Sequence, residues 1–205
     1  MVQVSSNGAP IPRRERNKLE KQRRILTAAA ELFQREGYTA VTTEGIAERA
    51  DIGIGTLFRY FPSKAELLVA VMNDLLELGI ARGLAAAHAG QPPSAAILTA
   101  VAPLAEAAIA QPENTSIYQR EALFGAARPR DSVQAHTLQL RDAITEILRI
   151  GGTVGDGIDV GRVAETIYAT MYVELARTTT GRADPGTLTD RLTATVNFLV
   201  AALLG

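Results

Sequence analysis

Apolar side chains recur every three to four positions along most of this 205-residue chain. That spacing is the period of an amphipathic helix, and no segment shows the alternation typical of a half-buried strand. Prolines and glycines bound the apolar runs, so the pattern predicts an all-α fold. The predicted helices cover about Asn17–Glu36, Thr43–Ala50, Ile54–Tyr60, a long helix after Ser63, and Ser94–Ala110, Asn114–Ala127, Ser132–Arg149, Asp159–Thr179 and Pro185–Leu204. The first of them places Ile25, Ala29, Leu32 and Phe33 on one face, and the apolar residues of the long helix are Leu67, Leu68, Val71, Leu75 and Leu78.

Two short predicted helices and the break between them occupy residues 43–60. Thr42 stands just before the first helix, where its hydroxyl can cap the free backbone amides. Residues 51–53 interrupt the apolar pattern, and Ile52 is the single apolar side chain there that can enter the core. This arrangement is typical of a helix-turn-helix unit.

The second short helix has one inward and one outward face. Leu57 and Phe61 lie four residues apart and face inward, whereas small residues and Arg59 face outward. Pro62 ends the helix, and Ser63 with Glu66 forms a capping box that opens the next one. An outward face of this kind suits close approach to a DNA groove.

The run RILTAAAELFQREGYTAVTTEGIAERADIGIGTLFRYFPSKAELL, residues 24–68, resembles the amino-terminal domain of the TetR (tetracycline repressor-like) family of transcriptional regulators. The matching features are REGY at 35–38, Ile46 with Ala47, and GTLFRYFPSK at 55–64. The resemblance implies a homodimer that binds a palindromic DNA operator and releases it when a small-molecule effector occupies the second domain.

Carried over position by position, the resemblance implies a three-helix DNA-binding head. Thr42, Thr43, Tyr60 and Lys64 would contact backbone phosphates, and the second short helix would face the major groove. The complete set expected at DNA is Thr42, Thr43, Gly53, Ile54, Gly55, Thr56, Phe58, Arg59, Tyr60 and Lys64.

Three positions depart from the usual family pattern. Phe58 stands where tyrosine is usual, Gly53 where serine or threonine is common, and Glu44 where some members carry a basic residue. Arg59 is then the one strong donor on the reading face. We therefore expect specificity to come largely from apolar contacts with thymine methyl groups, made by Ile54 or Phe58, and from DNA shape.

Charge is divided unevenly along the chain. Residues 1–64 carry 11 Lys or Arg and 7 Asp or Glu, a net charge of +4, whereas the remainder carries −5. The basic end suits a polyanionic partner, although a solvated start without a partner is the alternative. The predicted organisation is a disordered, basic-ended tail at 1–14, a helix-turn-helix domain at 15–62, and a helical ligand-binding and dimerisation domain at 63–205.

The last two predicted helices carry more apolar surface than one subunit needs to cover. In the first, Val163, Ile167, Met171 and Leu175 form one stripe, and Ala164, Tyr168 and Tyr172 form a second. In the final helix, Leu188, Leu192, Val196, Leu199 and Leu203 form a stripe, with Ala194, Phe198 and Ala201 beside it. The pattern favours a four-helix dimer interface, and the alternative is a pair of ordinary core helices.

Aromatic residues with a few polar groups on the middle helices are candidates for a pocket that takes a small amphipathic effector. They are Tyr118, Glu121, Phe124, His136, Tyr168 and Tyr172. Each has a plainer interpretation: the aromatic side chains can be core, His136 can lie on the surface, and Glu121 can pair with Arg120 or Arg128. If Glu121 faces the cavity, cationic or hydroxylated ligands are favoured.

Composition argues against other classes of protein. Cysteine is absent and there are only two histidines, so neither a metal site nor a nucleophile–histidine site is indicated, and no cofactor is expected. The glycine-rich loop at 151–157 lacks the lysine and hydroxyl of a phosphate-binding P-loop.

We find no uninterrupted run of eighteen apolar residues and no signal segment, so we expect a cytoplasmic protein without membrane contact. The remaining alternative is a helical module that binds small molecules or proteins without reading DNA.

Overall fold

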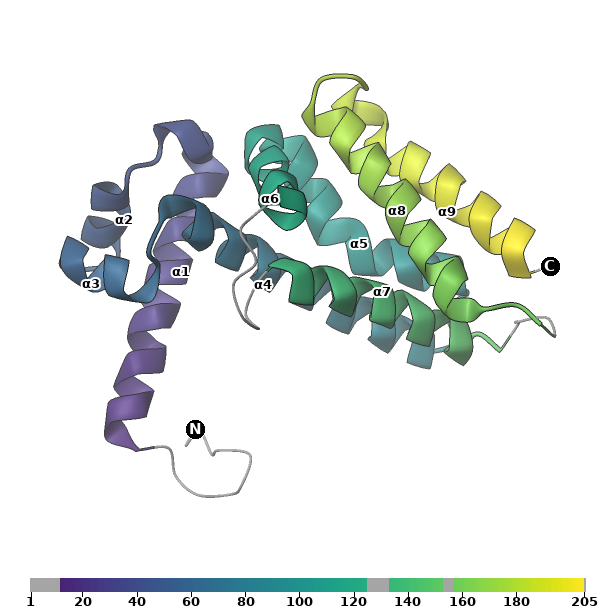
Figure 1. The fold of residues 1–205 in the computed structure, drawn as a ribbon, viewed down its shortest axis with the longest axis horizontal. Helices are drawn as coiled ribbons and strands as arrows, with labels where there is room; N and C mark the ends of the chain where they lie inside the picture. The colour runs from purple at the N-terminus through teal and green to yellow at the C-terminus, as the bar shows by residue number, and fades with distance from the viewer. Residues whose placement is uncertain (1–11, 125–132, 153–156, 205) are drawn as a thin grey trace. The chain divides into compact units, whose positions relative to one another are not determined.

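The computed structural model describes residues 12–124, 133–152 and 157–204. These residues form nine α-helices and one short 3-10 helix, without strands, which confirms the all-α prediction (Figure 1). In chain order the elements are α1 (Arg13–Ala40), α2 (Thr43–Arg49), α3 (Ile54–Tyr60), α4 (Lys64–His88), α5 (Pro93–Ala110), α6 (Pro112–Phe124), α7 (Val133–Ile150), α8 (Val160–Thr179), η1 (Pro185–Thr187) and α9 (Leu188–Leu204).

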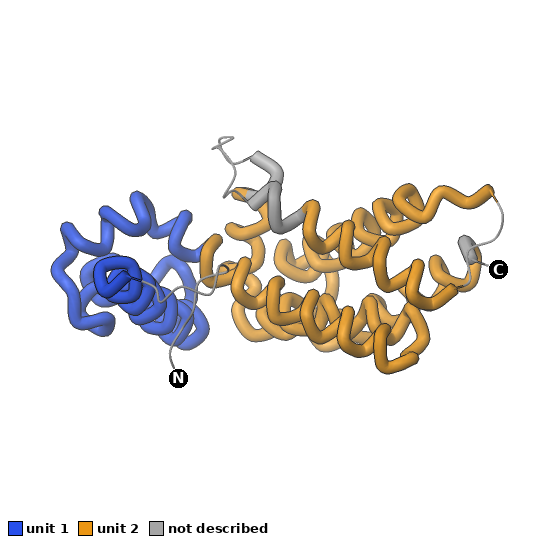
Figure 2. The backbone as a smooth tube through the Cα atoms, turned by 90° about the horizontal axis from the view of Figure 1, so that it is seen from below, with its two compact units in different colours: residues 1–68 blue, residues 69–205 orange. Residues whose placement is uncertain are grey.

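The chain divides into two compact units between Leu68 and Val69, inside α4 (Figure 2). The sequence placed this boundary after Pro62, two residues beyond the end of α3. Residues 64–68 of α4 belong to the first unit, and two of them, Leu67 and Leu68, are fully buried. Helix α4 is therefore one continuous element shared by both units.

The first unit packs α1, α2 and α3 around a small apolar core (Figure 1). The inward residues of α1 that the sequence predicted, Ile25, Ala29, Leu32 and Phe33, are all buried, together with Ile46 and Leu57. Thr42 caps α2, because its hydroxyl oxygen accepts a hydrogen bond of 3.1 Å from the Gly45 amide. Such a cap contributes about 1 kcal/mol.

The turn between α2 and α3 is held by a long-range contact that the sequence did not reveal. Its left-handed residue is Asp51, with φ 52°, and not the neighbouring glycine. Aspartate tolerates this conformation better than most residues. Arg24 of α1 donates to the Asp51 carbonyl at 3.1 Å and lies 3.5 Å from the Asp51 carboxylate. Ile52, predicted to enter the core, is only half-buried.

The second unit is a bundle in which α5 contacts α6, α7, α8 and α9. Helices α8 and α9 also pack against each other as a hairpin (Figure 1). Helix α4 approaches α5 closely at Gly79, where an added Cβ atom would lie 2.1 Å from the Ala100 carbonyl oxygen. The glycine is therefore needed for this contact.

Helix α5 is long and apolar enough to cross a membrane by length and composition, with a mean hydropathy of 1.5. The apolar core helix of a bundle passes the same test. Eight of its residues, Ala96, Ile97, Ala100, Val101, Pro103, Leu104, Ala105 and Ala108, are buried among neighbouring helices.

Two details of the predicted helices were wrong. Helix α1 begins at Arg13 and not near Asn17, so the first arginines are helical, and residues 1–11 of the predicted tail lie outside the described residues. On α4, Leu78 is exposed and Leu75 half-buried, whereas Met72 and Leu76 enter the core. Helix α1 bends at Gly37, with φ 77°, where the sequence predicted the end of the first helix.

Candidate nucleic-acid interface and ligand pocket

Helix α3 presents an apolar and basic face to solvent, as the sequence predicted. Ile54 is 38% exposed and Phe58 43% exposed, while Leu57 on the opposite side is fully buried. A substantial part of each of these two large apolar side chains is therefore left in solvent. They are available to a partner, and so are the exposed Gly55 and Arg59 between them.

The two glycines at the start of α3 have space around them. A Cβ atom added at Gly53 or Gly55 would meet nothing within 4 Å, and neither residue needs a positive φ. Gly53 is the N-cap of α3 and provides no side-chain hydrogen bond to the free amides. The fold therefore does not require glycine at either position, whereas close approach of a partner to the backbone would.

Among the described residues, some basic side chains of the first unit pair with acidic residues of other elements, and others are exposed without such a long-range partner. Arg24 is bound to Asp51, and Arg49 pairs with Glu31 at 2.6 Å. Arg59 has no acidic partner in this part of the chain, and its guanidinium lies 5.8 Å from the centre of the adjacent Tyr60 ring. At the start of α1 the exposed basic residues are Arg13, Arg14, Arg16, Lys18, Lys21 and Arg23.

Lys64 has a structural task that the sequence did not predict. Its ammonium donates hydrogen bonds of 2.8 Å to the carbonyl oxygens of Tyr38 and Val41, and lies 4.2 Å from the centre of the Tyr38 ring. These contacts tie the start of α4 to the end of α1. An ammonium has three donors, so one remains for the predicted phosphate contact.

The other residues predicted at DNA lie around these groups. Thr42 is exposed but its hydroxyl already caps α2, and Thr43 is half-buried with its hydroxyl 3.2 Å from Glu44. Thr56 and Tyr60 are half-buried on α3. All ten predicted residues lie on α2, α3, the turn and the start of α4, within the first unit.

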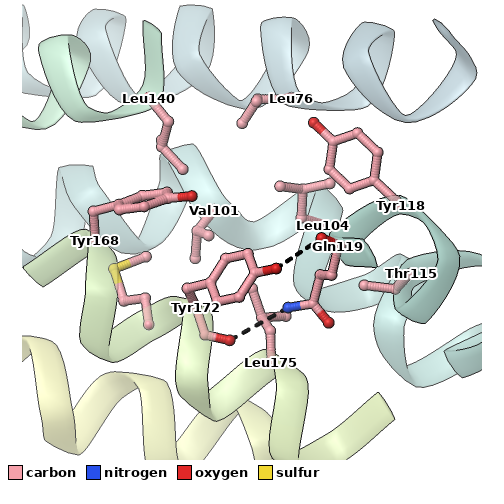
Figure 3. A pocket seen from close by; sticks show the side chains of 11 residues that line it. Leu76, Val101, Leu104, Thr115, Tyr118, Gln119, Leu140, Tyr168, Tyr172 and Leu175 are labelled. Atoms are coloured by element: carbon pink, nitrogen blue, oxygen red, sulfur yellow. Dashed lines mark hydrogen bonds between the residues drawn. The ribbon is translucent and has the colours of Figure 1, made fainter. Parts of the chain in front are cut away.

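The second unit contains a small pocket between α4, α5, α6, α7 and α8 (Figure 3). Its volume is about 40 Å³, whereas pockets that hold drug-sized ligands measure roughly 300–1,000 Å³. The pocket is therefore nearly closed in this state, and a ligand of that size has to push its walls apart. The lining residues are Leu76, Val101, Leu104, Thr115, Tyr118, Gln119, Leu140, Tyr168, Met171, Tyr172 and Leu175.

Hydrogen bonds tie the polar residues of the pocket to its walls. Tyr172 donates from its hydroxyl to the Gln119 carbonyl at 2.9 Å, and the Gln119 amide donates to the Tyr172 carbonyl at 3.3 Å (Figure 3). Gln119 also accepts a bond from Thr179. Tyr118 donates to the buried Asn73 of α4 at 2.9 Å, which joins α6 to the helix shared by the two units.

Burial makes Tyr118 and Tyr172 poor acids. Desolvation raises the pKa of Tyr118 above its usual range, and Tyr168 and Tyr172 add to the effect. Desolvation is the larger cause, and the neighbouring Tyr168 the smaller one, of a rise in the pKa of Tyr172 to about 12.

Thr115 is buried, and its hydroxyl forms no hydrogen bond with any described residue. Burying an unpaired polar group of this kind lowers stability by about 1–3 kcal/mol.

Of the six residues predicted for the pocket, the structure brings together Tyr118, Tyr168 and Tyr172. Glu121 does not line it; its carboxylate lies 3.3 Å from Arg120, the plainer alternative that the sequence allowed. The side chains of Phe124 and His136 lie outside the described residues.

The sequence reasoning missed Thr115 and Gln119, although helical spacing could have found them. Thr115, Tyr118 and Gln119 are related by three and four residues and share one face of α6. Tyr168, Met171, Tyr172 and Leu175 share a face of α8 in the same way. No cluster of three or more His, Cys, Asp or Glu side chains that could hold a metal occurs in the described ranges.

The hairpin of α8 and α9 leaves large apolar side chains in solvent. Val173 is 53% exposed and Phe198 is 70% exposed. The first predicted stripe of α8 is buried, whereas Tyr168 and Tyr172 of the second are half-buried. The predicted stripe of α9 is buried apart from Leu199, which is half-buried, and Leu203, whose side chain is not described. The small residues beside Phe198, Ala194 and Ala201, are also exposed.

A helix-turn-helix unit joined by one long helix to a helical bundle with an internal pocket defines a class of DNA-binding regulators. The family of bacterial regulatory proteins named after TetR matches residues 25–71. The HTH-type transcriptional repressor KstR of Mycolicibacterium smegmatis is 31% identical over 182 residues, 88% of this chain and 87% of the relative. The chain therefore belongs to the TetR family, and it is a regulatory protein, not an enzyme.

Solved structures of the family share the fold. A TetR transcriptional regulator from Rhodococcus sp. RHA1 superposes with a TM-score of 0.67 at 20% identity, covering 91% of this chain and 99% of that one. FadR of Thermus thermophilus, in complex with lauroyl-CoA, also gives 0.67 at 24% identity, covering 90% of this chain and 95% of that one.

Proposed function

We propose that the protein is a ligand-responsive transcriptional repressor that binds a palindromic operator as a homodimer. The observation that carries the proposal is the exposed face of α3, where Ile54, Phe58 and Arg59 surround a glycine backbone that the fold leaves open. Such a face suits the major groove, with Arg59 and the basic start of α1 on phosphates or bases. An operator partner places the protein in the cytoplasm.

Dimerisation is supported by the exposed apolar surface of α8 and α9. Val173 and Phe198 lie on consecutive helices of one hairpin, and a second copy can cover both by a two-fold arrangement. A symmetric dimer carries two α3 helices, and consecutive major grooves on one side of DNA recur about 34–36 Å apart. This arrangement explains why the operator should be palindromic.

The pocket of the second unit is the proposed effector site. Helix α4 contacts this pocket through two residues. Leu76 lines it, and Asn73 accepts a hydrogen bond from Tyr118 in the pocket wall. A ligand that widens the pocket therefore acts on the helix whose first turn belongs to the DNA-binding unit. The relative named KstR is a repressor and FadR was solved with lauroyl-CoA, which supports a repressor whose effector carries an apolar chain.

Selection of genomic fragments on the purified protein tests this function. We expect the retained fragments to share an inverted repeat, and base-by-base substitution of that repeat to show thymine and shape preferences more than guanine contacts. Fragments retained without any common repeat would contradict specific operator binding. Several strongly guanine-specific positions would contradict the assigned roles of Ile54 and Phe58.

The alternative function is a helical module that binds small molecules or proteins without reading DNA. The pocket alone would suit it, but it leaves the open face of α3 and the uncompensated Arg59 without a role. Absence of any DNA preference over random duplex would favour this alternative.

A further inference from the structure

Thr115 offers hydrogen-bonding capacity that the protein itself does not use. Its side chain is 2% exposed, it lines the pocket, and its Oγ1 has no partner among the described residues (Figure 3). By contrast, the hydroxyls of Tyr118 and Tyr172 and the amide of Gln119 already donate to the protein. A threonine hydroxyl can donate and accept, so a molecule in the pocket can bond to it through a carbonyl, ether or hydroxyl oxygen.

Among the described residues, no side chain that lines this pocket could pair with a charged ligand. Of the eleven described residues that line it, none is Asp, Glu, Lys, Arg or His. The walls are formed by leucine, valine, methionine and tyrosine, with Thr115 and Gln119 as the other polar members. An ion that enters such a space loses its hydration shell and finds no opposite charge.

We propose that Thr115 is the polar anchor of this pocket, which takes an uncharged, mainly apolar molecule with an oxygen function set against the Thr115 hydroxyl. Alcohols, ketones and esters belong to this class. The inference deepens the proposed function and rests on it for the regulatory role of the pocket, but not for the binding itself.

The variant Thr115→Val separates this role from a structural one. Valine has nearly the shape of threonine but lacks the hydroxyl, so it removes a buried polar group that is unpaired in the empty protein. The empty variant should therefore be more stable, with a melting temperature raised by about 2–4 °C. Its affinity for an oxygen-bearing ligand should fall roughly five- to tenfold.

Calorimetric titration of the full-length protein with 1-octanol, octanoate and octylammonium tests both parts. We expect 1-octanol to bind most tightly and Thr115→Val to weaken it as stated. The matched control is Thr145→Val, because Thr145 is buried on α7, bonds the Arg141 carbonyl and does not line this pocket. That control should leave 1-octanol binding unchanged.

Three results would overturn the inference: octanoate or octylammonium binding at least as tightly as 1-octanol, equal 1-octanol affinity in wild type and Thr115→Val, or no binding of 1-octanol at all. DNA binding by the empty protein is measured in parallel on operator fragments. If the empty protein binds its operator while any of these results appears, the ligand class is wrong and the regulatory function stands. If operator binding fails while 1-octanol binds through Thr115, the anchor stands and the regulatory function fails.

Discussion

Gly55 and Gly79 lie in helices for different physical reasons. An added Cβ atom at Gly55 meets nothing, whereas one at Gly79 would lie 2.1 Å from a carbonyl oxygen of α5. The second glycine is required by packing inside the protein. Packing within the described residues does not require the first, and in the proposed function the DNA backbone approaches it closely.

Gly55→Ala should therefore leave the fold intact and weaken DNA binding. Alanine is a better helix former, so the free energy of unfolding should be unchanged or raised by up to about 1 kcal/mol. Operator affinity should fall at least about fivefold, because the methyl group separates closely packed surfaces. Urea unfolding and operator titration measure the two effects.

The control for this prediction is Gly79→Ala, which should lower stability by about 1–3 kcal/mol through overpacking. Operator affinity that is unchanged in Gly55→Ala would show that the backbone of α3 does not approach DNA closely.

At the scale of elements, the boundaries of α3 were predicted at both ends. Breakers flank it, with residues 51–53 before and Pro62 after. The start of α1 was missed because residues 13–16 include no apolar side chain to reveal a period, although arginine is a good helix former. The face of α4 was misjudged for a different reason. It is rich in leucine all round, so periodicity alone could not choose Leu76 over Leu75 or Leu78.

The pocket was only partly predictable because it depends on which helices meet. Aromatic residues indicated Tyr118, Tyr168 and Tyr172, but no local pattern distinguishes a glutamate that enters a cavity from Glu121, which pairs with its neighbour. The intramolecular tasks of Arg24 and Lys64 were equally invisible, since each bonds to backbone carbonyls far away in the sequence.

The α8–α9 hairpin depends on Arg191. Its guanidinium donates to Glu174 at 2.8 Å, to Thr178 at 2.6 Å, and to the Asp184 carbonyl and Thr187 hydroxyl near η1. Glu174 is mostly buried, so losing Arg191 leaves its carboxylate with Arg177 as its remaining ion-pair partner among the described residues.

Arg191→Met should lower the free energy of unfolding by about 1–3 kcal/mol, because charged hydrogen bonds are lost in a partly buried site. Urea unfolding measures this change. Arg162→Met, an exposed change on α8, should stay within about 0.5 kcal/mol. Equal stability of the two variants would mean that the Arg191 network does not hold the hairpin.

At the scale of the whole molecule, the account requires two copies of the chain. Phe198→Glu places a charge on the most exposed large apolar residue of α9, so we expect it to convert a dimer into a monomer. Sedimentation velocity over a concentration series measures the mass. Leu138→Glu on α7, which also places a charge on an exposed large apolar residue, should remain dimeric.

A wild-type protein that sediments as a monomer, or a Phe198→Glu variant that stays dimeric, would contradict the proposed interface. Monomeric Phe198→Glu should also bind operator less tightly, because each half-site is then bound independently.

The central claim is that the outward face of α3 reads DNA, and Arg59 tests it more cleanly than Lys64, which also supports the fold. The measurement is fluorescence anisotropy of labelled duplex from upstream of the protein's own gene, over a salt series, with wild type, Arg59→Ala and the control Arg82→Ala. We predict tight binding that weakens steeply with salt and is at least about tenfold weaker in Arg59→Ala alone. Binding that exceeds the binding to random duplex yet is equal in all three proteins would contradict the account.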